Sequence, residues 1–111
     1  MEKILKIKKD KYKSSRGGYS RLLDISCQKC NNKILVYQKD GPGNLRRLYM
    51  DRIFSPSSLV ELHKKDIKKI SPLKCNKCGF IMGMPYIYDK EKRKAFRIFQ
   101  DAVTKKIIKN N

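Results

Sequence analysis

Four cysteines, arranged as two identical pairs, constrain the fold of this chain more than any other feature. The cysteines are Cys27, Cys30, Cys75 and Cys78. Two residues separate the members of each pair, which lets both thiolates face one metal ion from a tight turn. The second cysteine of each pair is followed by Asn31 or Gly79, and these two residue types adopt positive φ most easily. We therefore expect two matched turns that together supply four ligands to one ion.

Three other uses of paired cysteines fit the sequence less well. A redox dithiol needs only one pair, at the start of a helix, and neither pair is followed by a convincing helical pattern. Two disulfides are typical of secreted chains. A rubredoxin-like iron site has the same geometry, but such electron carriers are usually acidic. We predict one structural Zn²⁺, because four thiolates leave no open position for a catalytic water.

The charge of the chain is strongly unbalanced. It has 28 Lys and Arg residues against 10 Asp and Glu residues, a net charge of +18 and a pI near 10. The excess lies along the whole chain and is heaviest at both ends. Solubility alone is usually met by a net charge of roughly 2 to 8 in a small domain. We therefore predict a polyanionic partner, with nucleic acid as the first candidate.

The apolar residues form neither a membrane-spanning run nor a secretion signal. No apolar run approaches the roughly 18 residues that cross a bilayer. Residues 1–21 lack the apolar centre of a signal peptide. We interpret the protein as cytoplasmic, without a membrane partner. Thiols stay reduced in that compartment, which favours metal binding over disulfides.

A length of 111 residues is enough for one small domain. Changes in composition divide it into three segments. Residues 1–20 are rich in Lys, Ser and Gly and predict a basic, flexible arm. Residues 21–89 contain both cysteine pairs and predict the metal-binding body. Residues 90–111 form a basic C-terminal segment.

The body contains an insertion between the two cysteine pairs. Residues 32–39 are β-branched and aromatic and predict a strand. A turn rich in Gly and Pro leads to a returning strand over residues 44–54, so a hairpin is expected. Residues 55–70 predict a short middle helix, in which Ser58 and Glu61 would form a capping box.

Apolar residues of the C-terminal segment recur at helical spacing. They are Ala95, Phe96, Ile98, Phe99, Ala102, Val103 and Ile107. Placed at about 100° per residue, they fill one half of a helical wheel whose opposite half is mostly basic. We predict an amphipathic helix over residues 90–111 that packs on the body, and hence a small α+β fold.

The paired cysteine turns, with Leu-Lys-Cys-Asn-Lys-Cys-Gly-Phe-Ile-Met-Gly as the second, resemble a zinc ribbon. The resemblance covers residues 24–54 and 72–88. It implies antiparallel β-hairpins around a four-cysteine zinc site, as in many ribosomal proteins and in transcription-factor and polymerase subunits. It implies a fold and a metal rather than an activity. Transcript-cleavage ribbons carry paired acidic residues at the hairpin tip, whereas the predicted tip here has only Asp40, so that activity is not implied.

The expected hairpin is unusually basic. It presents Lys39, Arg46, Arg47 and Arg52 among tyrosines and aliphatic residues. Guanidinium groups bind phosphate oxygens in a bidentate manner, and Tyr37 or Tyr49 could stack on an unpaired base. The alternative interpretation is that Arg52 pairs with Asp40 or Asp51 and that the tyrosines cover the core.

We predict a nucleic-acid surface that draws cations from the arm, the hairpin and the C-terminal segment. The candidate residues are Lys11, Lys13, Arg16, Arg21, Lys33, Lys39, Arg46, Arg47, Arg52, Arg93, Lys94 and Arg97. Charge spread over the chain, basic ends and interleaved tyrosines favour RNA, and rRNA within a ribonucleoprotein in particular.

No catalytic constellation is visible, and no small-molecule substrate is predicted. His63 is the only histidine, and the Gly-rich turn lacks the Lys-Ser/Thr of a phosphate-binding loop. The first hypothesis is thus a zinc-binding ribosomal or ribosome-associated RNA-binding protein rather than an enzyme. The alternatives are a transcription-associated ribbon that binds DNA or RNA polymerase, and a rubredoxin-like iron electron carrier.

Overall fold

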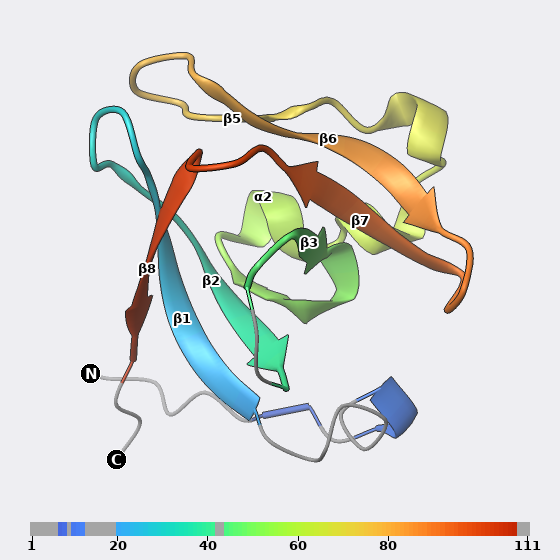
Figure 1. Cartoon of the computed structure of the whole chain (residues 1–111). Coiled ribbons are helices and arrows are strands. Elements are labelled where there is room, and N and C mark those ends of the chain that lie inside the picture. The colour runs from blue at the N-terminus through green and yellow to red at the C-terminus, as the bar shows by residue number, and fades with distance from the viewer. Residues whose placement is uncertain (1–6, 9, 13–19, 42–43, 109–111) are drawn as a thin grey trace.

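A computed structural model describes residues 7–8, 10–12, 20–41 and 44–108. This part of the chain folds into two four-stranded antiparallel sheets with one short α-helix (Figure 1). The fold is therefore a small α+β domain dominated by strands. No helix among the described residues is long and apolar enough to cross a bilayer.

The first sheet has the strand order β4-β2-β1-β8. Its strands are β1 (Ser20–Cys27), β2 (Lys33–Asp40), β4 (Ile53–Ser55) and β8 (Val103–Ile107). β1 and β2 pair as a long antiparallel hairpin, with Leu23 opposite Tyr37. β8 pairs with the other edge of β1. The predicted strand over residues 32–39 is confirmed as β2.

The second sheet has the order β3-β7-β6-β5. Its strands are β3 (Arg47–Tyr49), β5 (Leu73–Lys74), β6 (Ile81–Tyr88) and β7 (Arg93–Ile98). The first cysteine pair lies at the turn between β1 and β2, and the second lies between β5 and β6. Each pair thus occupies the end of a β-hairpin, one in each sheet.

The hydrophobic core lies between the two sheets. Period-2 alternation in β1 places Leu23, Ile25 and Cys27 in the core and leaves Asp24 and Ser26 less buried. The second sheet contributes buried side chains from several strands, including Leu48, Leu73, Met82 and Phe96. The two cysteine-bearing turns lie at the edge of this core, since Cys27 and Cys75 belong to the same buried cluster.

The predicted C-terminal helix is wrong. Residues 93–98 form β7 and residues 103–107 form β8, and Asp101 between them has a positive φ of 57°. The apolar residues do not share one buried face, because Phe96 is buried whereas Phe99 and Ile107 are 44% and 51% exposed. Strand pairing with β1, β3 and β6 overrides the helical spacing, helped by the β-branched residues of this segment.

The predicted return strand over residues 44–54 is only partly correct. Its last residues continue into β4, which pairs with β2 as a hairpin should. Its centre, β3, leaves the hairpin and pairs with β7 in the other sheet. The 3₁₀ turn η1 (Met50–Arg52) joins the two pieces. This turn breaks the strand alternation, so residues on either side of it do not share a face.

The middle segment is less helical than predicted. Only α2 (Ser57–Val60) is α-helical, and the 3₁₀ turns η2 (Leu62–Lys64) and η3 (Ile67–Lys69) follow it. The expected capping box does not form, because Pro56 is the N-cap and no side chain caps the helix. A cap does form at η3, where the Asp66 carboxylate accepts the Lys68 N–H at 3.1 Å.

The described part of the N-terminal arm lies against the body. The Lys8 N–H donates to Gln38 Oε1 at 2.6 Å, and the Lys8 carbonyl accepts from Gln38 Nε2 at 2.9 Å. Asp10 forms an ion pair with Arg52, and the Tyr12 hydroxyl donates to the Glu91 carbonyl. The predictions for residues 1–6, 9 and 13–19 lie outside the described residues.

Candidate metal centre and basic surface

The two cysteine turns are built alike. In the first turn the Asn31 N–H donates to the Cys27 carbonyl at 2.8 Å. In the second turn the Gly79 N–H donates to the Cys75 carbonyl at 2.9 Å. Asn31 and Gly79 have positive φ values of 65° and 80°, as expected for this position. The N–H of each first cysteine then closes the turn by donating to the carbonyl five residues later, at 2.8 and 2.9 Å.

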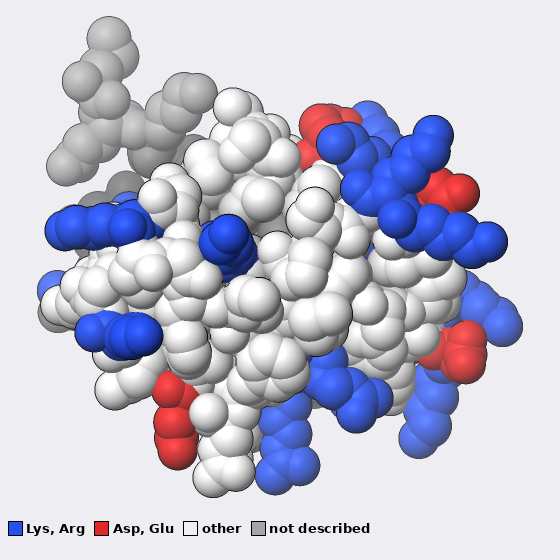
Figure 2. Space-filling model, turned by 90° about the horizontal axis from the view of Figure 1, so that it is seen from above, with Lys and Arg blue, Asp and Glu red and all other residues white. Residues whose placement is uncertain are grey.

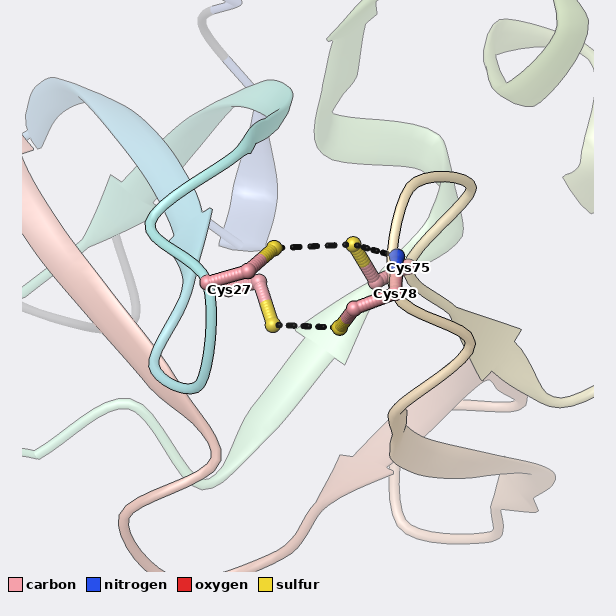
Figure 3. Close-up of side chains that lie close together, drawn as sticks. Cys27, Cys75 and Cys78 are labelled. Atoms are coloured by element: carbon pink, nitrogen blue, oxygen red, sulfur yellow. Dashed lines mark hydrogen bonds between the residues drawn. The ribbon is translucent and has the colours of Figure 1, made fainter.

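The four sulfur atoms converge on one point between the turns (Figure 3). Cys27 Sγ lies 3.7 Å from Cys78 Sγ, and Cys30 Sγ lies 3.5 Å from Cys75 Sγ. All four lie within 4.8 Å of one another, and all are free thiols. Four sulfurs at about 2.3 Å from a tetrahedral ion would be separated by roughly 3.8 Å. The prediction of a four-cysteine cluster is confirmed, and its geometry fits one metal ion.

Backbone hydrogen bonds in the second turn favour the thiolate form of Cys75. The backbone N–H groups of Cys78 and Lys77 donate to Cys75 Sγ at 3.5 and 3.4 Å. The Cys78 N–H lowers the pKa of Cys75 most, burial opposes it, and the net pKa is about 6. At Cys30 the Asn32 N–H lowers the pKa, but burial and the neighbouring thiols raise it to about 11. The two N–H donors thus favour the thiolate form of Cys75, the form that binds a metal ion.

Asn32 links the two turns. Its side-chain Nδ2 donates to Asn76 Oδ1 at 2.8 Å and approaches Cys75 Sγ at 3.8 Å. The first turn is also attached to the C-terminal segment, since the Gln28 N–H donates to the Ala102 carbonyl at 3.1 Å. Such outer contacts hold metal ligands in orientation. The two sheets are thereby held together at the cluster.

Two of the predicted nucleic-acid residues, Arg52 and Arg93, lie in the interior. They are only 2% and 4% exposed. Arg52 donates to Asp40 Oδ2 at 2.9 Å and to Asp10 Oδ1 at 2.5 Å. Its pairing with Asp40 agrees with the alternative interpretation of the sequence. Because this guanidinium is already bound to carboxylates, we exclude it from the candidate nucleic-acid surface.

Arg93 has an equivalent arrangement in the second sheet. Its Nε and Nη2 atoms donate to the two carboxylate oxygens of Asp51 at 3.1 and 2.6 Å, a bidentate pair. Its Nη1 donates to Glu91 at 3.2 Å. The guanidinium also lies 3.8 Å from the Tyr49 ring centroid and 4.0 Å from that of Tyr12. Arg93 is therefore also excluded from the candidate surface.

The tyrosines proposed for base stacking are buried. Tyr37 is 2% exposed and Tyr49 is 8% exposed. The Tyr49 N–H donates to the Tyr37 hydroxyl oxygen at 2.9 Å, and burial raises the pKa of Tyr37. Neither ring can stack on a base without opening the fold. The prediction for these two residues is corrected, and they are parts of the core.

The other predicted cations fall into four groups. Arg46, Arg47 and Arg97 are exposed, as is Lys11. Lys33, Lys39 and Lys94 contact the fold itself: Lys33 pairs with Asp24 at 2.8 Å, Lys39 donates to the Gly41 carbonyl, and Lys94 donates to the carbonyls of His63 and Lys65. Arg21 is half-buried on β1. Lys13 and Arg16 lie outside the described residues.

Sequence reasoning missed the aromatic residues that lie beside the exposed arginines. Arg47 lies 4.0 Å from the Tyr88 ring centroid, and Arg97 lies 4.9 Å from the Tyr86 ring centroid. Tyr86 and Tyr88 are two residues apart on β6 and thus share a face of the second sheet. The spacing of the two tyrosines could have indicated from the sequence that they share a strand face. Their arginine partners come from β3 and β7, however, and only the fold places those strands beside β6.

A groove opens beside this face, between residues 44–47 and the connection from β7 to β8. It has a volume of about 760 Å³. Arg46, Arg47, Arg97 and Lys105 line it, together with Tyr86 and Phe99. Asp101 is the acidic residue of its lining, and no ion pair within the described residues joins Asp101 to these cations.

Comparisons with protein-family models, with curated proteins and with solved structures give no match for this chain. The four-cysteine cluster on two β-hairpins is consistent with a zinc-ribbon-like site. The functional interpretation therefore depends on the geometry of the chain itself.

Proposed function

We propose that this protein is a zinc-binding RNA-binding protein, a structural or accessory component of a ribonucleoprotein such as the ribosome. Its metal would hold two sheets together, and its cationic surface would bind RNA phosphates. Four thiolates form a closed ligand set that leaves no position for a reacting water. A binding role is therefore favoured over a catalytic one.

The observation that carries the proposal is that many of the acidic residues form ion pairs with buried arginines. Four of the ten acidic side chains, Asp10, Asp40, Asp51 and Glu91, bind the two buried arginines. These six groups carry two positive and four negative charges, so the rest of the chain has a net charge of +20. Self-repulsion of this size is relieved by a polyanion.

The exposed charge is dispersed. Figure 2 shows lysines and arginines around the rim of one face, with a largely uncharged centre and few acidic side chains among them. Exposed cations also lie on β5 and on β8, including Lys74, Lys105 and Lys106. A distribution over both sheets and their connections suits contacts to several RNA segments better than one recognition element in a DNA groove.

Binding of the purified full-length protein to RNA tests the proposal. A structured rRNA fragment and a DNA duplex of equal length are compared over a range of salt concentrations. We expect tighter binding to RNA, with log K falling against log salt by about 0.7 per phosphate contact for single strands. Equal or tighter binding to duplex DNA would instead support the transcription-associated alternative.

The metal is tested on the same preparation. We expect one zinc per chain by elemental analysis and no absorption in the visible range. Iron in four thiolates absorbs visible light, so a coloured protein would support the rubredoxin-like alternative. Sedimentation of the tagged protein with ribosomal particles at low salt, and its release at high salt, would support the proposed ribonucleoprotein.

A further inference from the structure

Two arginines face each other across paired strands of the second sheet. Arg47 on β3 is the direct partner of Arg97 on β7 in an antiparallel ladder. Like charges at directly opposed positions are destabilising. Within the described residues, no ion pair joins either arginine to a carboxylate. The fold thus keeps two adjacent positive charges that a bound anion would neutralise.

Aromatic rings hold these guanidinium groups in place. The Arg47 guanidinium lies over Tyr88 and its Nε donates to the Tyr49 hydroxyl at 3.2 Å, while Arg97 lies over Tyr86. An arginine stacked on a ring keeps its planar edge of N–H donors free for phosphate. The pair is therefore oriented in advance for an anion with several acceptor oxygens.

The backbone around the groove is also fixed. The Ile98 N–H donates to the Arg46 carbonyl at 2.9 Å, which extends the pairing of β3 with β7. The Phe99 N–H donates to the Met82 carbonyl at 2.9 Å, and the turn closes where the Ala102 N–H donates to the Phe99 carbonyl at 3.2 Å. Phe99 is nonetheless 44% exposed and lines the groove. A rigid backbone thus presents an aromatic ring to solvent next to four cations.

We propose that this groove binds a single-stranded RNA segment, with phosphates at Arg46, Arg47 and Arg97 and an unpaired base against Phe99. The inference rests on the proposed function and assigns it a site. The volume of about 760 Å³ is in the range of small-ligand sites and accommodates a nucleotide. Lys105 adds a fourth cation from the first sheet.

The aromatic residues favour a single strand over a duplex. In a duplex the faces of the bases are covered by their neighbours, so a side chain can stack only on an unpaired base. Basic grooves with aromatic side chains are the usual way in which proteins bind single strands. The amide side chains of Asn44 and Gln100, which are exposed on the same groove, offer donors and acceptors for a ribose 2′-hydroxyl.

The test uses the full-length, metal-loaded protein and a short fluorescein-labelled oligouridylate. Phe99→Ala should weaken binding by about 10-fold, because one base stack contributes about 1–3 kcal/mol. Phe99→Tyr keeps a ring and should restore affinity. The double variant Arg47→Gln with Arg97→Gln should lose about 10-fold or more and lower the salt slope. The pair Lys68→Gln with Lys69→Gln on η3 removes the same charge outside the groove and should leave affinity within about 3-fold.

A second measurement separates contact from a change in folding. An oligonucleotide with 4-thiouridine should crosslink under ultraviolet light to the peptides that contain Tyr86 or Phe99. Groove variants that bind oligouridylate as tightly as the η3 control would overturn the groove assignment, while rRNA binding by the same proteins would leave the proposed function intact. Tighter binding of oligodeoxythymidylate would overturn RNA as the occupant. If the unmodified protein bound no RNA of any kind, the proposed function itself would fail.

Discussion

The sulfur atoms of Cys27 and Cys78 lie 3.7 Å apart, although the two residues are 51 positions apart in the chain. Cys27 ends a strand of the first sheet, and Cys78 lies in the turn between two strands of the second. A metal at this point therefore crosslinks the sheets at one end of the core. The stability of the fold should thus depend on this link and on the buried ion pairs of Arg52 and Arg93.

Removing the metal should unfold the packing between the sheets. Binding of structural zinc contributes on the order of 10 kcal/mol in small zinc domains, and this core is thin. Chelation, or Cys78→Ser, should abolish the cooperative thermal transition seen by near-ultraviolet circular dichroism. Asn32→Ala keeps all four ligands but loses the contact between the turns, and should weaken metal binding by about 10-fold. An unchanged melting temperature after complete chelation would contradict the structural role.

Neutralising Asp40 should be far more damaging than neutralising an exposed carboxylate. Asp40 accepts hydrogen bonds from Arg52 Nε, Ser20 Oγ and Gln38 Nε2 at 2.9, 2.6 and 2.8 Å. Breaking one partner of a buried ion pair typically costs about 3–5 kcal/mol. We expect Asp40→Asn to lower the free energy of unfolding in urea by nearly that amount. The loss should be somewhat smaller because the Asp10 carboxylate still pairs with Arg52. Asp89→Asn, at an exposed position, should stay within about 0.5 kcal/mol.

The same carboxylate should make stability depend on acid pH. Burial raises the pKa of Asp40, but its hydrogen bonds to Ser20, Gln38 and Arg52 outweigh burial and hold the pKa below its usual value of 3.8. A lowered folded-state pKa stabilises the fold above the unfolded-state pKa, and the contribution is lost as pH falls below about 4. Metal release also destabilises the protein in acid, so the comparison is with Asp40→Asn in excess zinc. The difference between the two unfolding free energies should stay constant between about pH 6 and 5 and shrink as pH falls below about 4; a difference that stays constant in acid would contradict the assignment.

The ring of Tyr12 should contribute to stability although it lies in the predicted flexible arm. It covers the guanidinium of buried Arg93 at 4.0 Å. Cation–π contacts with desolvated groups contribute about 2 kcal/mol, so Tyr12→Ala should lower the free energy of unfolding by about 1–2 kcal/mol. Tyr12→Phe keeps the ring and should retain most of the stability. If Tyr12→Ala had no effect, this part of the arm would not pack in solution.

Gly83 should tolerate no side chain. A Cβ added there would lie 2.7 Å from the Arg97 carbonyl oxygen and 3.1 Å from Ile98 Cδ1, so β6 and β7 would have to separate. We expect Gly83→Ala to cost about 1–3 kcal/mol, the usual range for overpacking. Ser58→Ala provides the control, since the Ser58 side chain caps no helix and is exposed. It should change stability by less than about 0.5 kcal/mol.

The metal cluster and the β2 strand could be predicted from the sequence because their signals are local. Two residues between cysteines, followed by Asn31 or Gly79, determine a turn whatever the rest of the chain does. The β-branched and aromatic residues of β2 likewise indicate a strand without reference to the rest of the chain. The cysteine turns and the β2 strand each depend on residues within about ten positions of one another, and the match between the two turns was enough to predict that they share one ion although they are 45 to 51 positions apart.

The C-terminal segment and the roles of the arginines were decided by the tertiary structure. Spacing of apolar residues in 95–107 suits a helix, but the segment pairs with β1, β3 and β6, whose free edges the sequence does not reveal. Arg52 and Arg97 are alike in sequence, yet one is buried between Asp10 and Asp40 and the other is exposed beside a groove. The sequence by itself determined the ligand set and the excess of positive charge, because both follow from residue type and short spacing. Only the fold determined which charges are neutralised inside and which face a partner, because that depends on carboxylates up to 42 positions away.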